Sequence, residues 1–186
     1  MKYFWLILSL VAFSQAYPAR VPYYGSADMT PRWHGTFHRV EPCGLYQPPS
    51  GPYVVRFFFT RCGSVCPTLT SNLRPVTAPI VSLSVDPDED TPETMAAYAR
   101  REGLPGNWSF AHGDVGRIHE FARESLFCGP EDFRRTASGK EVMHSEKLFL
   151  VDARGRLRGI YNGSLPLEVQ NLQDDLQKLN KPLTAW

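Results

Sequence analysis

The residues best suited to chemistry are two cysteines separated by three residues, in the segment CGSVCP at 62–67. They follow the apolar run YVVRFFF at 53–59, which fits a strand buried on both faces. With three residues between them, both sulfurs can face one point. Cys66 lies near the start of an expected helix, where the helix dipole favours a thiolate. Cys62 and Cys66 therefore predict either a disulfide or a site for a soft metal.

A third candidate is His144, which precedes an expected hairpin strand. By itself, a hydrogen-bonded loop histidine is the simpler interpretation. Together with two thiolates, however, an imidazole gives a soft donor set of low coordination number that suits Cu(I). With Cu(II) the site is near neutral, because two negative sulfurs balance the metal. Structural zinc sites take four protein ligands, and no fourth Cys or His lies at such spacing. Copper is the metal that this set fits best.

The elements that must position these residues alternate between strand and helix. The strand at 53–59 runs into the cysteines, and Pro75 limits the helix after Pro67 to about two turns. The further expected elements are a strand at 79–85, a helix at 92–101, a strand at 107–111, a helix after Asp114, a hairpin of 146–151 with 157–161, and a last helix after Pro166. This order predicts an α/β fold with a mixed central sheet and helices on both faces, similar to a thioredoxin-like fold.

The N-terminus has the pattern of a signal peptide at 1–16, with Lys2, an apolar run and a small-x-small ending. The apolar run is shorter than the roughly 20 residues that a membrane span needs. We therefore expect export, with membrane association only through an uncleaved N-terminal segment. Residues 17–52 predict an irregular arm with a possible short hairpin, and residues 53–186 a single α/β domain.

Composition limits the classes of partner. The chain has 186 residues, 42% hydrophobic and 21% charged, which suits one globular domain. Its formal net charge of +1 is spread along the sequence without a dense Lys/Arg stripe. Because nucleic-acid binders carry such a stripe, nucleic acid is excluded as an expected partner.

Three segments together resemble the Sco/SenC family: FFFTRCGSVCP at 57–67, VDPDEDTP at 85–92, and His144-Ser145 leading into FLVDARGR at 149–156. They stand in the family's order, and the resemblance covers most of the chain after the signal peptide. It implies a thioredoxin-like fold and the copper ligands Cys62, Cys66 and His144. It also implies a role at the binuclear copper site of cytochrome c oxidase, by delivering copper or reducing its thiols. The residues alone indicate only a soft-metal or redox site.

The sequence departs from the family pattern near these motifs. The region between Cys66 and Ile80 is shorter than usual, and the stretch 40–52 looks trimmed. A carboxylate often found just before the family histidine is replaced by Val142-Met143, which removes a candidate partner for the imidazole. For Met143 we expect a role in core packing rather than as a thioether ligand.

Several other residues invite functional interpretations. Cys43 and Cys128 lie outside the family motif. They could form a disulfide with each other or remain separate buried thiols, and the sequence leaves both alternatives open. Asp86 and Asp90 are explained by a proline turn and a helix cap rather than by acid–base work. Surface or packing roles are expected for the remaining histidines, His34, His38, His112 and His119.

Two functions follow as hypotheses. The first is an exported, periplasmic copper metallochaperone that is not an enzyme, and its client is the copper-bearing subunit of cytochrome c oxidase or another exported protein. The alternative is a thiol–disulfide oxidoreductase with Cys62 and Cys66 as the catalytic redox pair. The three-residue spacing and His144 favour copper. A peroxiredoxin-like peroxidase is excluded, because Gly63 and Phe59 stand where its threonine and proline are required.

Overall fold

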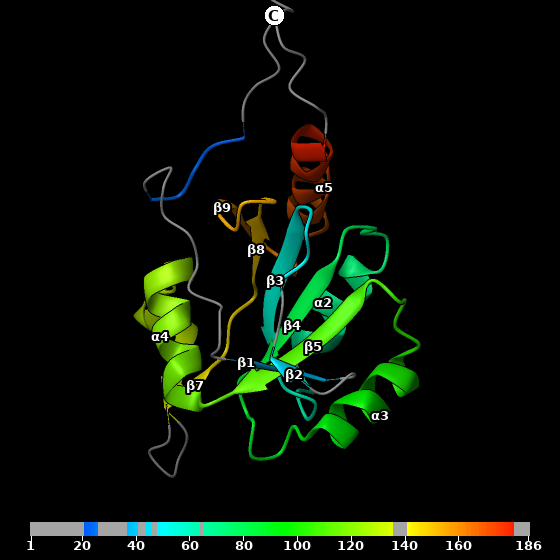
Figure 1. The fold of residues 1–186 in the computed structure, drawn as a ribbon, viewed down its shortest axis with the longest axis vertical. Helices are drawn as coiled ribbons and strands as arrows, with labels where there is room; N and C mark the ends of the chain where they lie inside the picture. The colour runs from blue at the N-terminus through cyan, green and yellow to red at the C-terminus, as the bar shows by residue number, and fades with distance from the viewer. Residues whose placement is uncertain are drawn as a thin grey trace, which may run out of the picture.

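The computed structural model describes residues 21–25, 37–40, 44–45, 48–63, 65–135 and 141–180 (Figure 1). Its strands are β1 (Phe37–Val40), β2 (Gly44–Leu45), β3 (Tyr53–Phe58), β4 (Ile80–Ser84), β5 (Trp108–Gly113), β6 (Phe133–Arg135), β7 (Glu141–Met143), β8 (Lys147–Val151) and β9 (Leu157–Asn162). Its helices are α2 (Val65–Leu73), α3 (Pro92–Glu102), α4 (Val115–Leu126) and α5 (Pro166–Asn180), with a 3₁₀ helix η2 (Pro130–Asp132).

A seven-stranded mixed sheet, in the order β2-β1-β5-β4-β3-β8-β9, forms the centre of the described part of the chain. The three inner strands β5, β4 and β3 are parallel, and helices connect them. On either side, β1 and β8 pair antiparallel with β5 and β3. The expected closing hairpin is present, with β9 antiparallel to β8. The predicted mixed α/β sheet is therefore confirmed.

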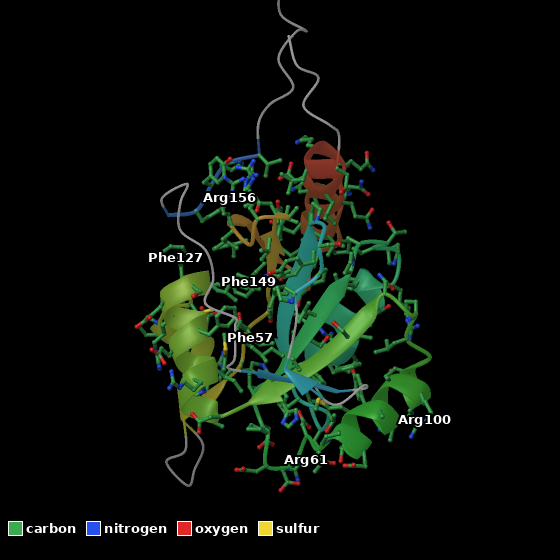
Figure 2. The ribbon with its side chains drawn as sticks, viewed as in Figure 1. Phe57, Arg61, Arg100, Phe127, Phe149 and Arg156 are labelled. Carbon is green, nitrogen blue, oxygen red and sulfur yellow. The ribbon has the colours of Figure 1, made fainter. Side chains whose placement is uncertain are left out.

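Helices cover both faces of this sheet. Every side chain of β3 is buried, and alternate side chains point to opposite faces. Val55 and Phe57 join a core cluster with α4, and Phe149 of β8 packs edge-on against Phe57 (Figure 2). Val54 and Phe58 face α2, α3 and α5 on the other side. α4 lies apart from these three helices in Figure 1.

The caps expected from the sequence define where the helices begin and end. The Thr91 hydroxyl accepts a hydrogen bond from the Thr94 N–H at 3.2 Å and starts α3. Gly103 ends α3 with φ 56°, a left-handed conformation that glycine adopts at little cost. The Asp114 carboxylate accepts from the Arg117 N–H at 3.0 Å and starts α4.

The structure adds two features to the expected elements. After α4, β6 pairs antiparallel with β7 in a separate small sheet. Each of these strands has three residues, which is too short to show an alternation of polar and apolar residues. In addition, β1 joins the main sheet, and with β2 it forms the short hairpin considered possible within the region 17–52. The sheet thus extends across the domain boundary expected at residue 52.

The expected signal peptide at 1–16 lies outside the described residues. Where the structure does describe the chain, it contains no helix with the length and apolar character needed to cross a bilayer.

Candidate functional site

The two motif cysteines lie beyond the carboxyl end of β3. The chain turns there, and the Cys62 N–H donates to the Phe59 carbonyl oxygen at 3.1 Å. Cys66 is the second residue of α2 and only 5% exposed, whereas Cys62 is half-buried. Arg61 beside them is exposed and points outward (Figure 2). The pair thus occupies the edge of the sheet where α/β folds commonly place their sites.

The thiol of Cys66 is strongly shielded from water. Burial raises its pKa to about 12, and its hydrogen bond with the Cys62 thiol acts in the same direction. The Phe59 backbone and the charge of Arg56 lower the pKa by smaller amounts. The expectation that the start of α2 favours a thiolate at Cys66 is therefore wrong for the protein without metal, because desolvation outweighs the helix dipole. A metal must displace the thiol proton in order to bind.

A buried carboxylate in the loop between β4 and α3 braces the cysteine loop. Asp90 is 1% exposed and accepts hydrogen bonds from the Thr60 N–H at 3.0 Å and the Thr60 hydroxyl at 2.5 Å. It also accepts from the Ser84 hydroxyl at 2.6 Å. The cap of α3 is Thr91. Asp90 therefore has a role beyond the turn or helix cap that the sequence predicted for it. It ties the end of β4 to the residues just before Cys62.

His144 follows β7 and reaches the same edge of the sheet. Its N–H donates to the Asp132 carbonyl oxygen at 2.8 Å, and its ring lies 6.4 Å from the ring of Phe59. Met143 is 1% exposed and belongs to the main core cluster, in agreement with the packing role expected for it.

A buried carboxylate from another segment holds the loop that carries His144. Asp132 is 4% exposed and accepts from the Ser145 hydroxyl at 2.7 Å and from the Lys147 ammonium group at 2.5 Å. It also accepts from the Gly129 N–H at 3.0 Å. Together with the backbone contact to His144, these bonds fix the loop between β7 and β8. Sequence reasoning missed Asp132, since it stands twelve residues before His144 with no motif to connect them.

Two of the three predicted metal ligands share one pocket. Cys66 and His144 line it, together with Phe57, Phe58, Phe59, Val65, Val85, Met143 and Ser145. Cys62 contacts Cys66 and does not line the pocket. Over the described residues, no three Cys, His, Asp or Glu side chains are close enough together to hold a metal ion. The donor types fit a soft metal, but binding by all three requires that His144 and the cysteines approach one another.

The other predicted residues lie elsewhere or outside the described part of the chain. Cys128 is buried, which raises its pKa to about 12. Its suggested partner Cys43 is outside the described residues, so that disulfide stays a prediction. His119 is buried on α4, with its ring 5.0 Å from the Phe133 ring, and His112 lies on β5. Neither His112 nor His119 lines the pocket. His34 and the side chain of His38 are not described.

Comparison with known sequences identifies the relatives of this chain. The family described as SCO1/SenC matches residues 23–181. The SCO1 protein homolog of Bacillus subtilis (strain 168) is 28% identical over 122 residues, which are 60% of this chain. The match spans 62% of that relative's length, which is less than two thirds.

Solved structures show the same fold. A SCO1/SenC family lipoprotein from Bacillus anthracis str. Ames has a TM-score of 0.62 at 25% identity, over 71% of this chain and 83% of that one. BsSco, a Sco family member in which a disulfide switch was identified, has a TM-score of 0.63 at 24% identity, over 84% and 96%. Bradyrhizobium japonicum ScoI, solved with copper bound, has a TM-score of 0.50 at 24% identity, over 69% and 85%.

These similarities confirm the predicted thioredoxin-like fold. The family match extends over most of the chain and includes both motif cysteines and the histidine. This chain therefore belongs to the SCO1/SenC family.

Proposed function

We propose that this protein is an exported copper metallochaperone that delivers copper to the binuclear copper site of cytochrome c oxidase. The observation that carries the proposal is that Cys66 and His144 line one pocket while the Cys62 thiol contacts Cys66. Two sulfurs and one imidazole suit Cu(I). The copper bound to the Bradyrhizobium japonicum relative supports copper as the metal, and BsSco belongs to a family of cytochrome c oxidase assembly proteins.

Copper is the cargo in this proposal. When Cu(I) binds, the metal replaces the protons of both thiols, and the protons leave to water. His144 then supplies the third ligand by moving toward the cysteines. Three ligands leave space for a ligand of the accepting protein, so copper passes by ligand exchange without a change of oxidation state.

The location of the protein belongs to the same proposal. A chaperone for an oxidase subunit acts in the periplasm or at the periplasmic face of the inner membrane. The signal-peptide pattern at 1–16 supports export, and the Bacillus anthracis relative is a lipoprotein.

The test is an anaerobic Cu(I) titration of the reduced protein against a chromophoric chelator, repeated with His144→Ala. We expect one copper per chain, and binding at least about tenfold weaker in the variant. His112→Ala is the matched control, because His112 lies on β5 outside the pocket. Absence of tight copper binding, or equal binding by wild type and His144→Ala, contradicts the proposed site.

The contact between the two thiols favours a second function, thiol–disulfide exchange. The more exposed Cys62, as a thiolate, attacks a partner disulfide, and the partner's S–S bond breaks to form a mixed disulfide. Cys66 then loses its proton and displaces the partner, leaving a Cys62–Cys66 disulfide and a reduced partner. The disulfide switch of BsSco supports this chemistry. A protein that binds no copper tightly but cycles this disulfide with a dithiol has the second function.

A further inference from the structure

Arg56 is an unusual charged residue, because it lies in the middle of β3 and is fully buried. Its side chain enters the face of the sheet that α2 covers. Nε donates to the Ser82 hydroxyl and Nη1 to the Thr70 hydroxyl, both at 2.9 Å. Nη2 is buried and makes no hydrogen bond of good geometry, although Arg56 interacts with the nearby Tyr98 hydroxyl. The guanidinium is thus held firmly but only partly satisfied.

No carboxylate balances this charge in the part of the chain that the structure describes. The guanidinium carbon lies 4.7 Å from the Trp108 ring centroid and 5.5 Å from that of Phe58, so aromatic faces surround it. An unpaired buried charge is costly, and an apolar side chain would fill the same space without that cost. The charge of Arg56 therefore calls for a nearby group that can become negatively charged.

The cysteine pair can supply that negative charge. Thr70 follows Cys66 by four residues on α2, so the two side chains lie on one face of the helix, one turn apart. Since Arg56 bonds to Thr70, its guanidinium lies close to the turn that holds Cys66. Its charge acts on Cys66, on Cys62 and on Tyr98. Both cysteines become thiolates when they bind a metal.

We propose that Arg56 is the buried counter-charge of the copper–thiolate site and that it selects Cu(I) over Cu(II). This inference rests on the proposed copper function. Two thiolates and an imidazole carry one net negative charge with Cu(I) and none with Cu(II). A fixed positive charge beneath the site stabilises the first complex and leaves the second almost unaffected. Arg56 acts through its charge and is not a ligand.

A purely structural role for Arg56 makes a different prediction. If Arg56 only held β3 against α2, its loss would disturb the cysteine loop and weaken binding of every metal alike. A counter-charge distinguishes monovalent from divalent metals on the same ligands. The quantity to measure is therefore how differently the loss of Arg56 changes the affinity for a monovalent metal and for a divalent metal.

The experiment measures Cu(I) binding, and Zn(II) binding as a divalent probe without redox chemistry, in wild type, Arg56→Met and Arg56→Lys. In the neutral Arg56→Met variant we expect Cu(I) binding to weaken about tenfold or more and Zn(II) binding to change less than about threefold. Arg56→Lys keeps the charge and should retain most of the Cu(I) affinity. The matched control is Arg74→Met, because Arg74 is exposed on the turn after α2 and its replacement changes the net charge equally.

Far-ultraviolet circular dichroism verifies the fold of every variant. The possible outcomes then separate the inference about Arg56 from the proposed copper function. Equal weakening of Cu(I) and Zn(II) binding, or unchanged Cu(I) binding in Arg56→Met, overturns the inference while the copper function stands. If the wild type itself binds no Cu(I) tightly, the proposed function fails and the inference falls with it. If Arg56→Met does not fold, Arg56→Gln provides the neutral variant, since its amide can still donate to Thr70.

Discussion

Cys62 and Cys66 have unlike surroundings, although the motif presents them as an equal pair. Cys66 is packed among Phe58, Met95 and Tyr98, whereas Cys62 is half-buried at the margin of this cluster. The thiol pKa of Cys66 is raised to about 12, first by burial and then by the hydrogen bond to Cys62. The residue that meets a partner first is therefore Cys62, and Cys66 follows when the pocket opens or a metal enters.

Alkylation of the reduced, metal-free protein checks this difference. At pH 8, a pKa of about 12 leaves only about one Cys66 thiol in ten thousand ionised, and the thiolate is the reactive form. We expect iodoacetamide to modify Cys62 well before Cys66, as followed by peptide mass spectrometry over time. Buried Cys128 is the internal control, since its pKa is also raised to about 12. Modification of Cys66 ahead of Cys62 would show that the thiols are arranged differently.

At the scale of the elements, sequence patterns predicted those parts of the fold that follow from local chemistry. The expected cap at Thr91 sets the start of α3, and the buried run at 53–59 corresponds to β3. The small sheet of β6 and β7 was not predictable, because its strands are too short for a period to appear. The site was also only partly predictable from local sequence. The environment of Cys66 depends on tertiary packing, and the loop of His144 depends on contacts with the distant residue Asp132.

The hydrogen bonds of Asp132, which the sequence patterns did not reveal, lead to a prediction about stability. Asp132→Ala removes the carboxylate that accepts from Ser145, Lys147 and Gly129, and Lys147 keeps only its contact with exposed Glu131. We expect the free energy of unfolding in urea to fall by about 2–3 kcal/mol. Cu(I) binding should also weaken, because the loop that carries His144 loosens.

Glu131→Gln is the matched control for that variant. Glu131 contacts the same Lys147 ammonium group at 3.1 Å but is exposed, with its side chain 68% accessible. An exposed ion pair contributes little, so the free energy of unfolding should change much less than in Asp132→Ala. Equal losses in both variants would mean that the buried bonds of Asp132 do not stabilise the loop.

At the scale of the whole molecule, the sheet topology explains why residues so distant in sequence lie at one edge of the sheet. The parallel strands β3 and β4 end at the same edge, which brings the cysteine loop beside Asp90. β8 is antiparallel to β3, so its beginning lies beside the end of β3, and His144 stands just before β8. The family resemblance implied one site for the cysteines and the histidine, and the strand order is the physical reason that they lie at the same edge of the sheet.

The buried thiols also set how the stability of the whole molecule depends on pH. The pKa values of Cys66 and Cys128 are both raised by burial, from an ordinary 9.0 to about 12. The folded protein thus keeps protons that the unfolded chain releases. The free energy of unfolding therefore falls as the pH rises. The stabilisation is complete below about pH 9 and is lost as the pH rises from 9 toward 12. Burial also raises the pKa of Tyr161 above its ordinary 10.0, which adds to the loss above pH 10.

We therefore expect the free energy of unfolding, measured in urea with a reductant present, to fall between pH 8.5 and 10.5. Each buried thiol contributes a slope of up to about 1.4 kcal/mol per pH unit once the unfolded chain is ionised. The double variant Cys66→Ala/Cys128→Ala loses stability at every pH through its cavities, but its curve should be flatter in this range, because the linked protons are gone. An equal slope in wild type and double variant would assign the alkaline instability to other groups and would contradict the burial of both thiols in their neutral form.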